Sequence, residues 1–404
     1  MRGVIRQRAL IIGGSVGGLF AAHLLRAAGW DVAVFERSRG DLADRGASIG
    51  TRPELFEIMG RLGIALDPSI GVAVRARICL DRSGAIVHEV PTPSVNSAWD
   101  RIYRPLREAF PDALYHAGMR LERVEQQGER VVAIFADGAH QEGDLLIGAD
   151  GIHSTVRRQF LPEIEPRYAG YVAWRGVIEE SALTAEEHAL LFGRMAFCLP
   201  EGELLLGLGM PGRGADTRPG NRRYYWIWFR PVEFQRALPR LCTDASGICH
   251  GTSIPGPLVR SEVMGELREA AVAKLAPQLA AIIARTAQPF PHGIFDVESP
   301  RIVFGRVLVL GDSAFVARPH VGAGITKAAL DAQCLADALG RSGDLPAALA
   351  HYETERSESG RRLIARARHL GAHLEARAAG IGVDIRAQRP EVVLAEYGAA
   401  GKLL

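Results

Sequence analysis

Three short segments of the chain place glycine directly after an apolar run, and an acidic residue follows each of them. The first is the small-residue run Gly13 to Gly18, which follows the apolar residues 9–12 and precedes an amphipathic stretch at 19–28. Bare backbone lets a pyrophosphate approach, and the N-terminus of the following helix offers unpaired N–H groups. Glu36 lies 23 residues after Gly13 at the end of the next apolar run, close to the roughly 20 residues typical of a ribose acceptor. The pattern predicts a βαβ dinucleotide fold; a glycine-rich turn without a ligand is the alternative.

Two further segments, around Asp150 and Asp312, place a carboxylate beside a glycine after a short apolar run. In α/β sheets, ligands bind where parallel strands end, so these carboxylates are expected at that edge. Behind Asp312, residues 318–325 place a proline before two glycines that open a helix near Gly324. Free N–H groups there would face a carbonyl-bearing ring, and the helix dipole would stabilise negative charge on a reduced flavin. These two segments turn the dinucleotide prediction into a flavin prediction.

The composition is that of an ordinary globular enzyme and argues against several other classes. The chain has 404 residues, 48% of them hydrophobic and 23% charged, with a formal net charge of +2. This balance gives no reason to expect nucleic acid or an anionic membrane as a partner, and no apolar run approaches the roughly 20 residues of a membrane helix. The five cysteines lack metal-ligand spacing, so we expect reduced thiols, a cytoplasmic protein and no metal site. The first predicted strand begins within about ten residues of Met1, which leaves no room for a cleavable signal.

The coarse pattern of elements predicts an α/β protein in which a second sheet interrupts the nucleotide-binding one. Four runs of strand character predict an antiparallel sheet, two helices follow it, and a long helix closes the chain. These elements are the strands 168–178, 195–199, 204–210 and 223–229, the helices 261–275 and 278–286, and the helix 344–378. We therefore expect a Rossmann-like FAD-binding domain, an inserted antiparallel-sheet substrate domain and C-terminal helices. The predicted boundaries are 1–165 and 300–345 for the FAD-binding domain, 72–100 and 165–300 for the substrate-binding sheet regions, and 345–404 for the C-terminal helical segment.

The three motifs resemble those of the single-component FAD-dependent aromatic hydroxylases, the group A flavoprotein monooxygenases. The resemblance runs from the Gly-rich turn through residues 146–157 (Leu-Ile-Gly-Ala-Asp-Gly-Ile-His-Ser-Thr-Val-Arg) to the Gly-Asp pair at 311–312. Residues 168–177 and the Arg-Pro-His run at 318–320 are most similar to the members that hydroxylate dihydroxypyridines. The resemblance implies the aromatic hydroxylase fold, bound FAD, NADH or NADPH as a transient co-substrate, and O₂. It also implies a small aromatic substrate and a homodimer.

The resemblance assigns roles to individual residues. Ser15 to Gly17 would cover the FAD pyrophosphate, Glu36 and Arg37 would hold the adenosine ribose, and Arg45 would lie near the mobile flavin. The full set of expected cofactor-binding residues is Gly13, Ser15, Val16, Gly17, Glu36, Arg37, Arg45, Asp150, Asp312, Gly322, Ala323, Gly324 and Ile325. The expected catalytic residues are Pro319, His320 and Arg45, and the expected substrate-binding residues are Trp174, Arg175, Trp226 and His320.

Several of these residues have a structural alternative that the sequence leaves open. Asp150 either lies beside the cofactor or only caps its turn. His320 either hydrogen-bonds the flavin or substrate, or packs beneath its loop. Trp174 and Arg175 either line the substrate cavity or belong to the core of the sheet.

The implied reaction is hydroxylation of an electron-rich, hydroxylated aromatic ring. NAD(P)H would reduce FAD, O₂ would add at flavin C4a, and the resulting hydroperoxide would attack the ring. A hydroxypyridine is the expected substrate, and a substituted phenol, including one that loses a side chain or carboxyl group on hydroxylation, is the main alternative. A flavin-dependent dehydrogenase or reductase without oxygen insertion and a non-catalytic nucleotide-binding scaffold are further alternatives. A halogenase, suggested by residues 226–231, would need a lysine on the FAD side, and the chain has none before Lys274.

Overall fold

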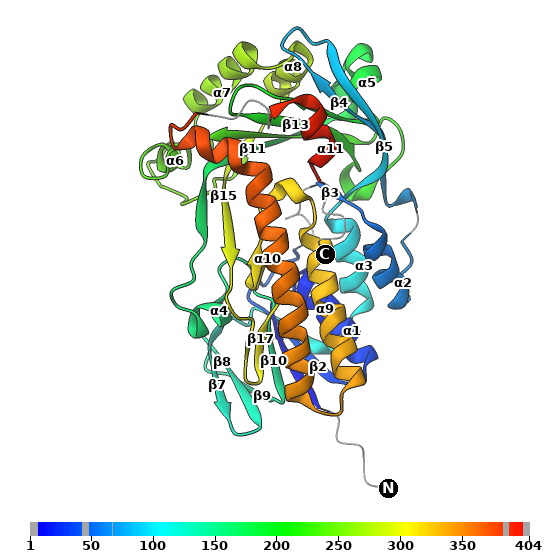
Figure 1. Ribbon diagram of the computed structural model, residues 1–404, viewed down its shortest axis with the longest axis vertical. Helices are drawn as coiled ribbons and strands as arrows, with labels where there is room; N and C mark the ends of the chain where they lie inside the picture. Colours follow the sequence, from blue (N-terminus) through cyan, green and yellow to red (C-terminus); the bar gives the residue numbers. More distant parts are fainter. Residues whose placement is uncertain (1–6, 43–47, 67, 383–387, 399–404) are drawn as a thin grey trace.

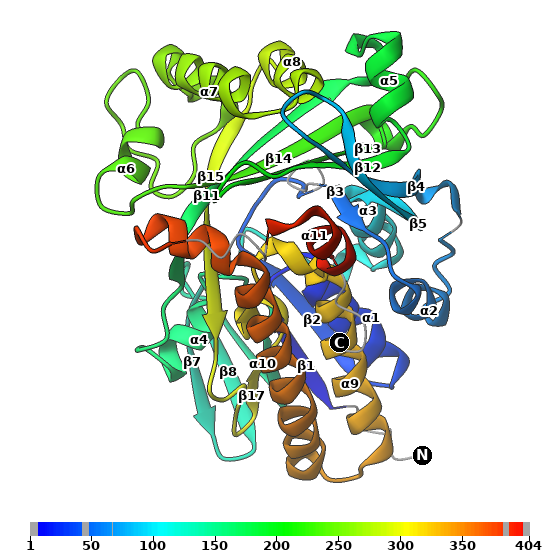
Figure 2. The same ribbon diagram turned by 45° about the horizontal axis from the view of Figure 1, so that its top comes forward.

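The computed structural model describes residues 7–42, 48–66, 68–382 and 388–398. A six-stranded sheet lies in the lower half of the molecule and a nine-stranded sheet in the upper half (Figures 1 and 2). The long helix α10 (Leu345–Ala378) runs beside the lower sheet and reaches the upper one. The chain crosses between the two halves several times, so each half is built from segments far apart in the sequence.

The six-stranded sheet carries all three segments that the sequence singled out. Its order is β16-β17-β10-β1-β2-β6, with β16 antiparallel to β17 and the other neighbours parallel. The bounds are Val303–Phe304 for β16, Val307–Val309 for β17, Leu145–Gly148 for β10, Arg8–Ile12 for β1, Asp31–Glu36 for β2 and Tyr115–Ala117 for β6. The strands that precede Gly13, Asp150 and Asp312 are therefore the neighbours β1, β10 and β17. Their carboxyl ends meet at one edge, as the sequence predicts.

Two helices pack closely against each other on the lower sheet. α1 (Val16–Ala27) follows the Gly-rich turn, and α9 (Gly324–Arg341) lies against it and beside α10. A Cβ atom added to Gly17 would lie 3.5 Å from the Cβ of Ala328, so small residues permit this approach. A small antiparallel sheet packs against β1 and β10 as well. Its strands are β7 (Leu121–Gln127), β8 (Arg130–Phe135) and β9 (His140–Gly143).

The nine-stranded sheet is antiparallel except at one position. Its order is β18-β15-β11-β14-β13-β12-β4-β5-β3. The bounds are Phe315–Val316 for β18, Phe290–Glu298 for β15, Arg167–Glu179 for β11, Arg223–Pro231 for β14, Leu204–Met210 for β13, Arg194–Cys198 for β12, Gly71–Leu80 for β4, Ile86–Ala98 for β5 and Ser48–Gly50 for β3. The four strands that the sequence predicts between residues 168 and 229 are antiparallel neighbours, as expected. The pairing of β12 with β4 is parallel. The chain between the β4–β5 and β12–β13 hairpins passes through the lower half, so no short turn fixes their relative direction.

Alternation along the strands gives the upper sheet two different faces. Trp174 and Trp226 lie in an apolar layer with residues of α7 (Ser261–Lys274) and α8 (Pro277–Arg285), which cover the sheet at the top of the molecule. Arg175, next to Trp174 on β11, lies on the opposite face, toward the lower half. The sheet therefore presents its polar and cavity-forming residues to the nucleotide-binding half.

The C-terminal helix α11 (Pro390–Glu396) packs on β4 and β5, and Gly398 then donates a backbone hydrogen bond to the carbonyl of His320, at 2.8 Å. The remaining helices are α2 (Pro53–Arg61), α3 (Asp100–Ala109), α4 (Thr155–Phe160), α5 (Ala185–Leu191) and α6 (Ala237–Leu241). Among the residues described, no helix combines the length and the apolar character needed to cross a membrane. Within the same residues, no group of three or more His, Cys, Asp and Glu side chains is arranged to hold a metal ion.

Candidate active site

The turn after β1 is shaped by glycines that leave no space for a side chain. Gly13 has a φ of +112°, and a Cβ atom on it would lie 2.2 Å from the carbonyl oxygen of Ala149. A Cβ atom on Gly18 would lie 1.9 Å from the carbonyl oxygen of Gly13. Such distances are far below van der Waals contact, so both positions require glycine. The result is a turn in which bare backbone faces the edge of the sheet.

The N-terminus of α1 opens directly onto a cavity at this edge. Ser15 is the N-cap, its side chain forms no capping hydrogen bond, and the first turn holds no acidic residue. The N–H groups of that turn and the positive end of the helix dipole are therefore left for an anion. Val16 lies mostly buried in the core, so it can contribute through its backbone.

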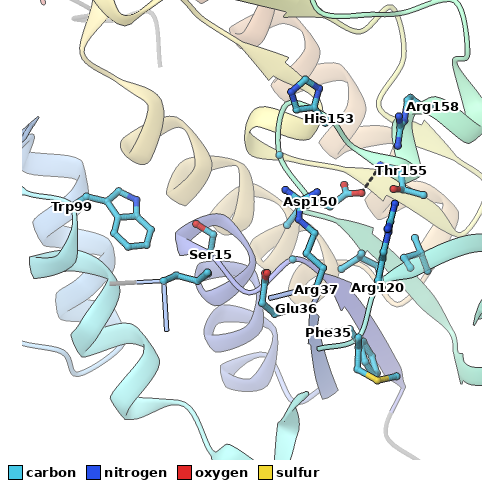
Figure 3. Close-up of a pocket in the computed structure, with 17 residues that line it drawn as sticks. Ser15, Phe35, Glu36, Arg37, Trp99, Arg120, Asp150, His153, Thr155 and Arg158 are labelled. Atoms are coloured by element: carbon cyan, nitrogen blue, oxygen red, sulfur yellow. Dashed lines mark hydrogen bonds between the residues drawn. The ribbon is translucent and has the colours of Figure 1, made fainter. Parts of the chain in front are cut away.

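Glu36 lies at the end of β2, on the wall of the same cavity (Figure 3). One carboxylate oxygen accepts from the Gly14 N–H and the other from the Ser38 N–H, both at 2.8 Å. These two bonds fix the side chain, and each oxygen keeps a further lone pair for a ribose hydroxyl. The cavity has a volume of about 500 Å³.

Basic side chains surround the outer part of this cavity. Arg37, Arg120, Arg158 and His153 line it and are themselves exposed (Figure 3). Within the described part of the chain, no carboxylate forms an ion pair with these three arginines. Burial lowers the pKa of His153, and the nearby arginines, Arg157 among them, lower it further. These three arginines outnumber the two carboxylates that line the cavity, Glu36 and Asp150, so the excess positive charge suits an anionic ligand.

Asp150 combines the two roles that the sequence left open. Its carboxylate accepts from the Ser154 hydroxyl at 2.5 Å and from the Thr155 N–H at 2.6 Å, which caps the N-terminus of α4. It also lines the cavity. Ser313, from the turn after β17, donates its hydroxyl to Asp150 at 3.1 Å and accepts from the Gly151 N–H at 2.8 Å. The contacts of Asp150 and Gly151 with Ser313 therefore join the turn after β10 to the turn after β17.

Arg157 supports the same junction from inside the protein. Its side chain is fully buried and donates to the carbonyl of Ser313 at 3.0 Å and to that of Ile152 at 2.5 Å. Burial lowers the pKa of Arg157, and the nearby Asp150 carboxylate opposes that shift. This positioning residue belongs to the segment 146–157, but its role depends on a partner 156 residues away and so left no local signal.

A buried ion network lies behind Asp312. The Asp331 carboxylate accepts from the Gly311 N–H at 2.9 Å, from Lys327 Nζ at 3.0 Å and from Arg356 Nε at 2.7 Å. Asp312 itself is open to solvent, although dense protein atoms around its carboxylate raise its pKa. The network thus fixes the backbone next to Asp312 while leaving the Asp312 carboxylate available. Lys327 and Asp331 stand four residues apart on α9, a spacing that could have indicated the pair from sequence.

A second cavity, of about 370 Å³, lies between the upper sheet and the loop after Arg318. Pro319 and Gly322 line it from the loop, and Gly322 has a φ of +56°. Arg175 lines it from the sheet, and Tyr397 closes it from the C-terminal segment. The two cavities give the site a nucleotide-binding compartment and a smaller compartment beside the loop.

His320 does not line this second cavity. It is fully buried and its ring nitrogens lie 2.6 Å from the Tyr171 hydroxyl and 3.4 Å from the Tyr397 hydroxyl. Burial lowers its pKa well below the ordinary value, and the nearby His373 and Arg318 add to this effect. The imidazole is therefore neutral near pH 7. Its position matches the alternative in which it packs beneath the loop.

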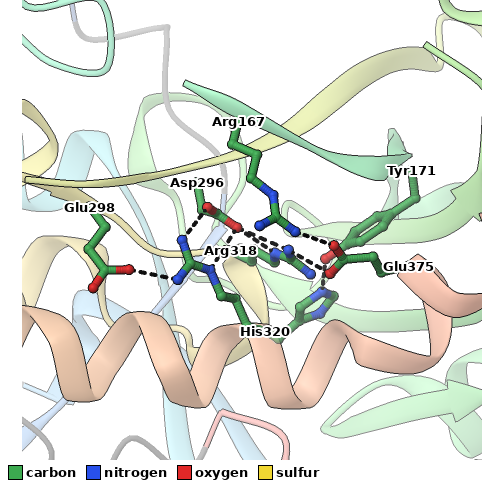
Figure 4. A network of polar contacts seen from close by, with 8 residues as sticks. Arg167, Tyr171, Asp296, Glu298, Arg318, His320 and Glu375 are labelled. Carbon is green, nitrogen blue, oxygen red and sulfur yellow. Dashed lines mark hydrogen bonds and ion pairs between the residues drawn. The ribbon is translucent and has the colours of Figure 1, made fainter. Parts of the chain in front are cut away.

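Arg318 anchors the same loop through a network of charges (Figure 4). Its fully buried guanidinium donates to Asp296 at 3.0 Å and to Glu375 at 2.8 Å. Arg368 donates to the other oxygen of Asp296 at 2.8 Å and to Glu298 at 2.6 Å. Burial would raise the pKa of Asp296, but the two arginines hold it below its usual range. Sequence reasoning missed this network because its members come from β15, the loop and α10.

Comparisons with known proteins agree over almost the whole chain. A family model described as an FAD binding domain matches residues 6–228, and one described as FAD binding domain-like matches residues 168–296. The 2,6-dihydroxypyridine 3-monooxygenase of Paenarthrobacter nicotinovorans is 33% identical over 370 residues, which cover 91% of this chain and 92% of that protein. The FAD-dependent urate hydroxylase of Klebsiella pneumoniae is 29% identical and covers 90% of this chain and 89% of its own. The solved structure of 2,6-dihydroxypyridine-3-hydroxylase from Arthrobacter nicotinovorans matches with a TM-score of 0.86 and 31% identity, covering 93% of this chain and 97% of that one.

The chain belongs to the FAD-dependent aromatic hydroxylases. It is thus a single-component monooxygenase with FAD as its cofactor and NAD(P)H and O₂ as co-substrates. The family, the fold class and the cofactors that the sequence predicted are confirmed.

The first cavity of this hydroxylase fits FAD. The uncapped start of α1 and the Gly13 turn suit a pyrophosphate, and Glu36 suits a ribose. Like α1, helix α9 has an uncapped N-terminus: its N-cap Ala323 forms no side-chain capping hydrogen bond, and its first turn has no acidic residue. Gly324 is exposed and Ile325 half-buried there, so the backbone N–H groups of this turn are open to a ring carbonyl.

Three of the predicted site residues lie elsewhere or outside the structure. Trp174 and Trp226 are almost completely buried in the layer beneath α7 and α8, and Trp226 Nε1 donates to the Thr286 hydroxyl at 2.9 Å. Both tryptophans are therefore core residues of the sheet. Side chains alternate between the two faces of a strand, so the face of Trp174 and Trp226 is opposite to the one from which Arg175 lines the cavity. Arg45 lies outside the described residues.

Proposed function

We propose that this hydroxylase acts on an electron-rich, hydroxylated N-heteroaromatic ring of the hydroxypyridine type. The observation that carries the proposal is the second cavity, which lies between the nine-stranded sheet and the Pro319–Gly322 loop. Its volume of about 370 Å³ is at the lower end of the roughly 300–1,000 Å³ of ligand pockets and suits a single substituted ring. The similarity to an enzyme named for 2,6-dihydroxypyridine supports the same substrate type.

FAD supplies the redox and oxygen-transfer chemistry when it is bound, and the protein supplies placement and a dry cavity. Apolar side chains make much of the wall and exclude water from the ring: Met195, Leu206, Leu208, Ile227 and Phe229. Burial raises the pKa of Tyr225, so its hydroxyl stays protonated at neutral pH and can donate to a ring oxygen. Arg175 can stabilise negative charge on a ring hydroxyl that loses its proton, which makes the ring more electron-rich.

The proposed site residues follow from the same placement. Pro319 and Gly322 present the loop to the ring, and Arg175 contacts the substrate from β11. His320 holds the loop from behind and is a positioning residue. We further propose that residues 1–165 and 300–345 bind FAD, that 72–100 and 165–300 form the substrate-binding regions, and that 345–404 is a helical segment closing the site.

The experiment that tests this function is a screen of hydroxylated pyridines and phenols with the purified holoenzyme. We expect a hydroxypyridine to accelerate NADH or NADPH oxidation and to gain one oxygen atom, measured by mass spectrometry. Oxidation that yields only hydrogen peroxide would favour a dehydrogenase or reductase. Turnover of phenols but of no hydroxypyridine would instead identify a substituted phenol as the substrate.

Cytoplasmic location, a homodimer and the absence of a nucleic-acid partner complete the proposal. All five cysteines are free thiols, in keeping with a reducing compartment. Light scattering on the purified protein tests the dimer, and a mass of one chain would refute it.

A further inference from the structure

The second cavity contains three guanidinium groups and, among the residues described, no carboxylate lines it. Arg52 comes from the start of α2, Arg77 from β4 and Arg175 from β11. None of the three forms an ion pair within the described part of the chain. The buried Arg318, in contrast, forms ion pairs with two carboxylates.

The contacts of these arginines leave most of their donors unused. Arg52 Nη2 donates to the carbonyls of Gly398 at 2.5 Å and Val321 at 3.2 Å, and Arg77 Nη1 donates to the carbonyl of Leu394 at 2.6 Å. These acceptors are neutral. The Nε atoms of Arg52 and Arg175 are buried and have no hydrogen-bond partner. A guanidinium has five N–H donors in a planar fork, so each of the three has donors free for a ligand.

The positive charges in this cavity act on one another, and no carboxylate lies within ion-pair distance of them among the residues described. Burial lowers the pKa of Arg52 and of Arg77, and the charge of Arg52 lowers that of Arg77 further. Glu54 acts on Arg52 through space but lies beyond ion-pair distance. Arg77 and Arg175 both act on the Tyr397 hydroxyl, which places that hydroxyl near both groups. Half-buried cations of like sign are unfavourable unless an anion joins them.

We propose that Arg52, Arg77 and Arg175 bind a carboxylate carried by the aromatic substrate, so that this enzyme acts on hydroxylated aromatic carboxylates. A carboxylate offers two oxygens in a plane, which matches the guanidinium fork, whereas a ring hydroxylate offers one. The inference rests on the proposed function for the ring chemistry and adds the acidic substituent. Arg52 and Arg77 also bond the C-terminal segment, so the bound carboxylate lies at the junction of the sheet and that segment.

The test compares matched ligands that differ by one carboxylate. The probes are 2,6-dihydroxypyridine against 2,6-dihydroxypyridine-4-carboxylate, and phenol against 4-hydroxybenzoate. Binding to the holoenzyme is measured by the change in flavin absorbance and, independently, by the shift in unfolding temperature. We expect the carboxylate of at least one pair to bind on the order of tenfold to a hundredfold more tightly than its partner.

Variants then assign this preference to the arginines. Arg77→Gln should remove most of the preference while changing the affinity of the neutral ligand little. Arg175→Gln should also remove most of the preference, and it should weaken the neutral ligand as well, because Arg175 also faces the ring hydroxyl. Arg77→Lys should keep part of it, because the charge remains but the fork is lost. Arg268→Gln, at an exposed position of α7, is the matched control and should keep the full preference. Flavin content reports whether each variant folds.

Each outcome separates the two proposals. Preference for 4-hydroxybenzoate without binding of either pyridine supports the carboxylate site and refutes the hydroxypyridine function. Hydroxylation of 2,6-dihydroxypyridine, with no tighter binding of 2,6-dihydroxypyridine-4-carboxylate, supports the hydroxypyridine function and counts against the carboxylate site. The carboxylate site is also refuted if no carboxylate binds more tightly than its partner, or if the preference survives in both Gln variants.

Discussion

Replacing Asp331 with asparagine would test the idea that a buried network positions the FAD-binding turn. The substitution keeps the shape of the side chain and removes its charge. Lys327 and Asp331 are both almost completely inaccessible, and Arg356 is nearly so. Burial would raise the pKa of Asp331, but Lys327 and Arg356 hold it below its ordinary range. The native carboxylate is therefore ionised, and the variant leaves two buried cations without their counter-ion.

The expected loss of stability follows from what remains in the variant. Removing one partner of a buried ion pair costs roughly 3–5 kcal/mol, because the other charge stays buried. The amide oxygen can still accept from the Gly311 N–H, which keeps one of the three contacts. The amide N–H₂ group, however, must face one of the cations. We therefore expect a loss of about 3 kcal/mol in the free energy of unfolding, together with weaker retention of FAD.

The assay is urea unfolding of the apoenzyme, with the flavin content of the purified protein as a second readout. Asp337→Asn is the matched control, because Asp337 is on the same helix and pairs with Arg61 at 2.6 Å on the surface. A surface pair contributes about 0–1 kcal/mol, so the control should differ little from wild type. Adding Lys327→Met to Asp331→Asn should recover part of the stability, since it removes one of the unpaired charges. A loss below about 1 kcal/mol with full flavin content would refute the reasoning.

Three further predictions concern the turn, an acid-sensitive carboxylate and the core. Gly13→Ala should abolish FAD retention, because its Cβ atom would overlap a backbone carbonyl at a positive φ, and a normally yellow variant would contradict this. Burial would raise the pKa of Glu180, but hydrogen bonds from Arg222 and His188 hold it at about 2, below its ordinary 4.5. Its contribution, on the order of 2 kcal/mol, is therefore present above about pH 5 and lost as the pH falls toward 2. Unfolding of wild type and Glu180→Gln between pH 6 and 3 should converge, and parallel curves would exclude this origin. Trp226→Phe should lower stability by about 1–3 kcal/mol through a lost buried hydrogen bond and packing, yet leave substrate KM unchanged; a large KM change would place that side chain in the substrate cavity.

Local patterns were sufficient to predict the nucleotide-binding half. The Gly13 turn, Glu36 and the strands before Asp150 and Asp312 depend on neighbours in the sequence, and the structure places them at one edge of a sheet. The four strands predicted in the insertion also exist within one or two residues of their predicted bounds. The parallel pairing of β12 with β4 was not predictable, because it depends on how two distant hairpins dock.

The face that each side chain occupies was the part of the site that sequence could not decide. Trp174 and Arg175 are adjacent in β11, so one of them must face the helices and the other the cavity. Aromatic character favours the core face for Trp174 without excluding the cavity, and the packing of α7 and α8 decides between them. His320 poses the same problem on a loop, where its direction follows from the hydroxyls of Tyr171 and Tyr397, far away in the sequence.

The two turns expected to contact the flavin are held by the same kind of device. Asp331 with two cations lies behind Gly311, and Arg318 with its carboxylates lies behind the Pro319–Gly322 loop. Buried ion pairs contribute little net stability compared with apolar packing of the same volume, so stability alone does not account for two of them here. Directional contacts, in contrast, fix a backbone segment in one position without occupying its outer face. The ligand-facing atoms thereby remain free of protein partners, which is the condition for holding a cofactor rigidly without filling its site.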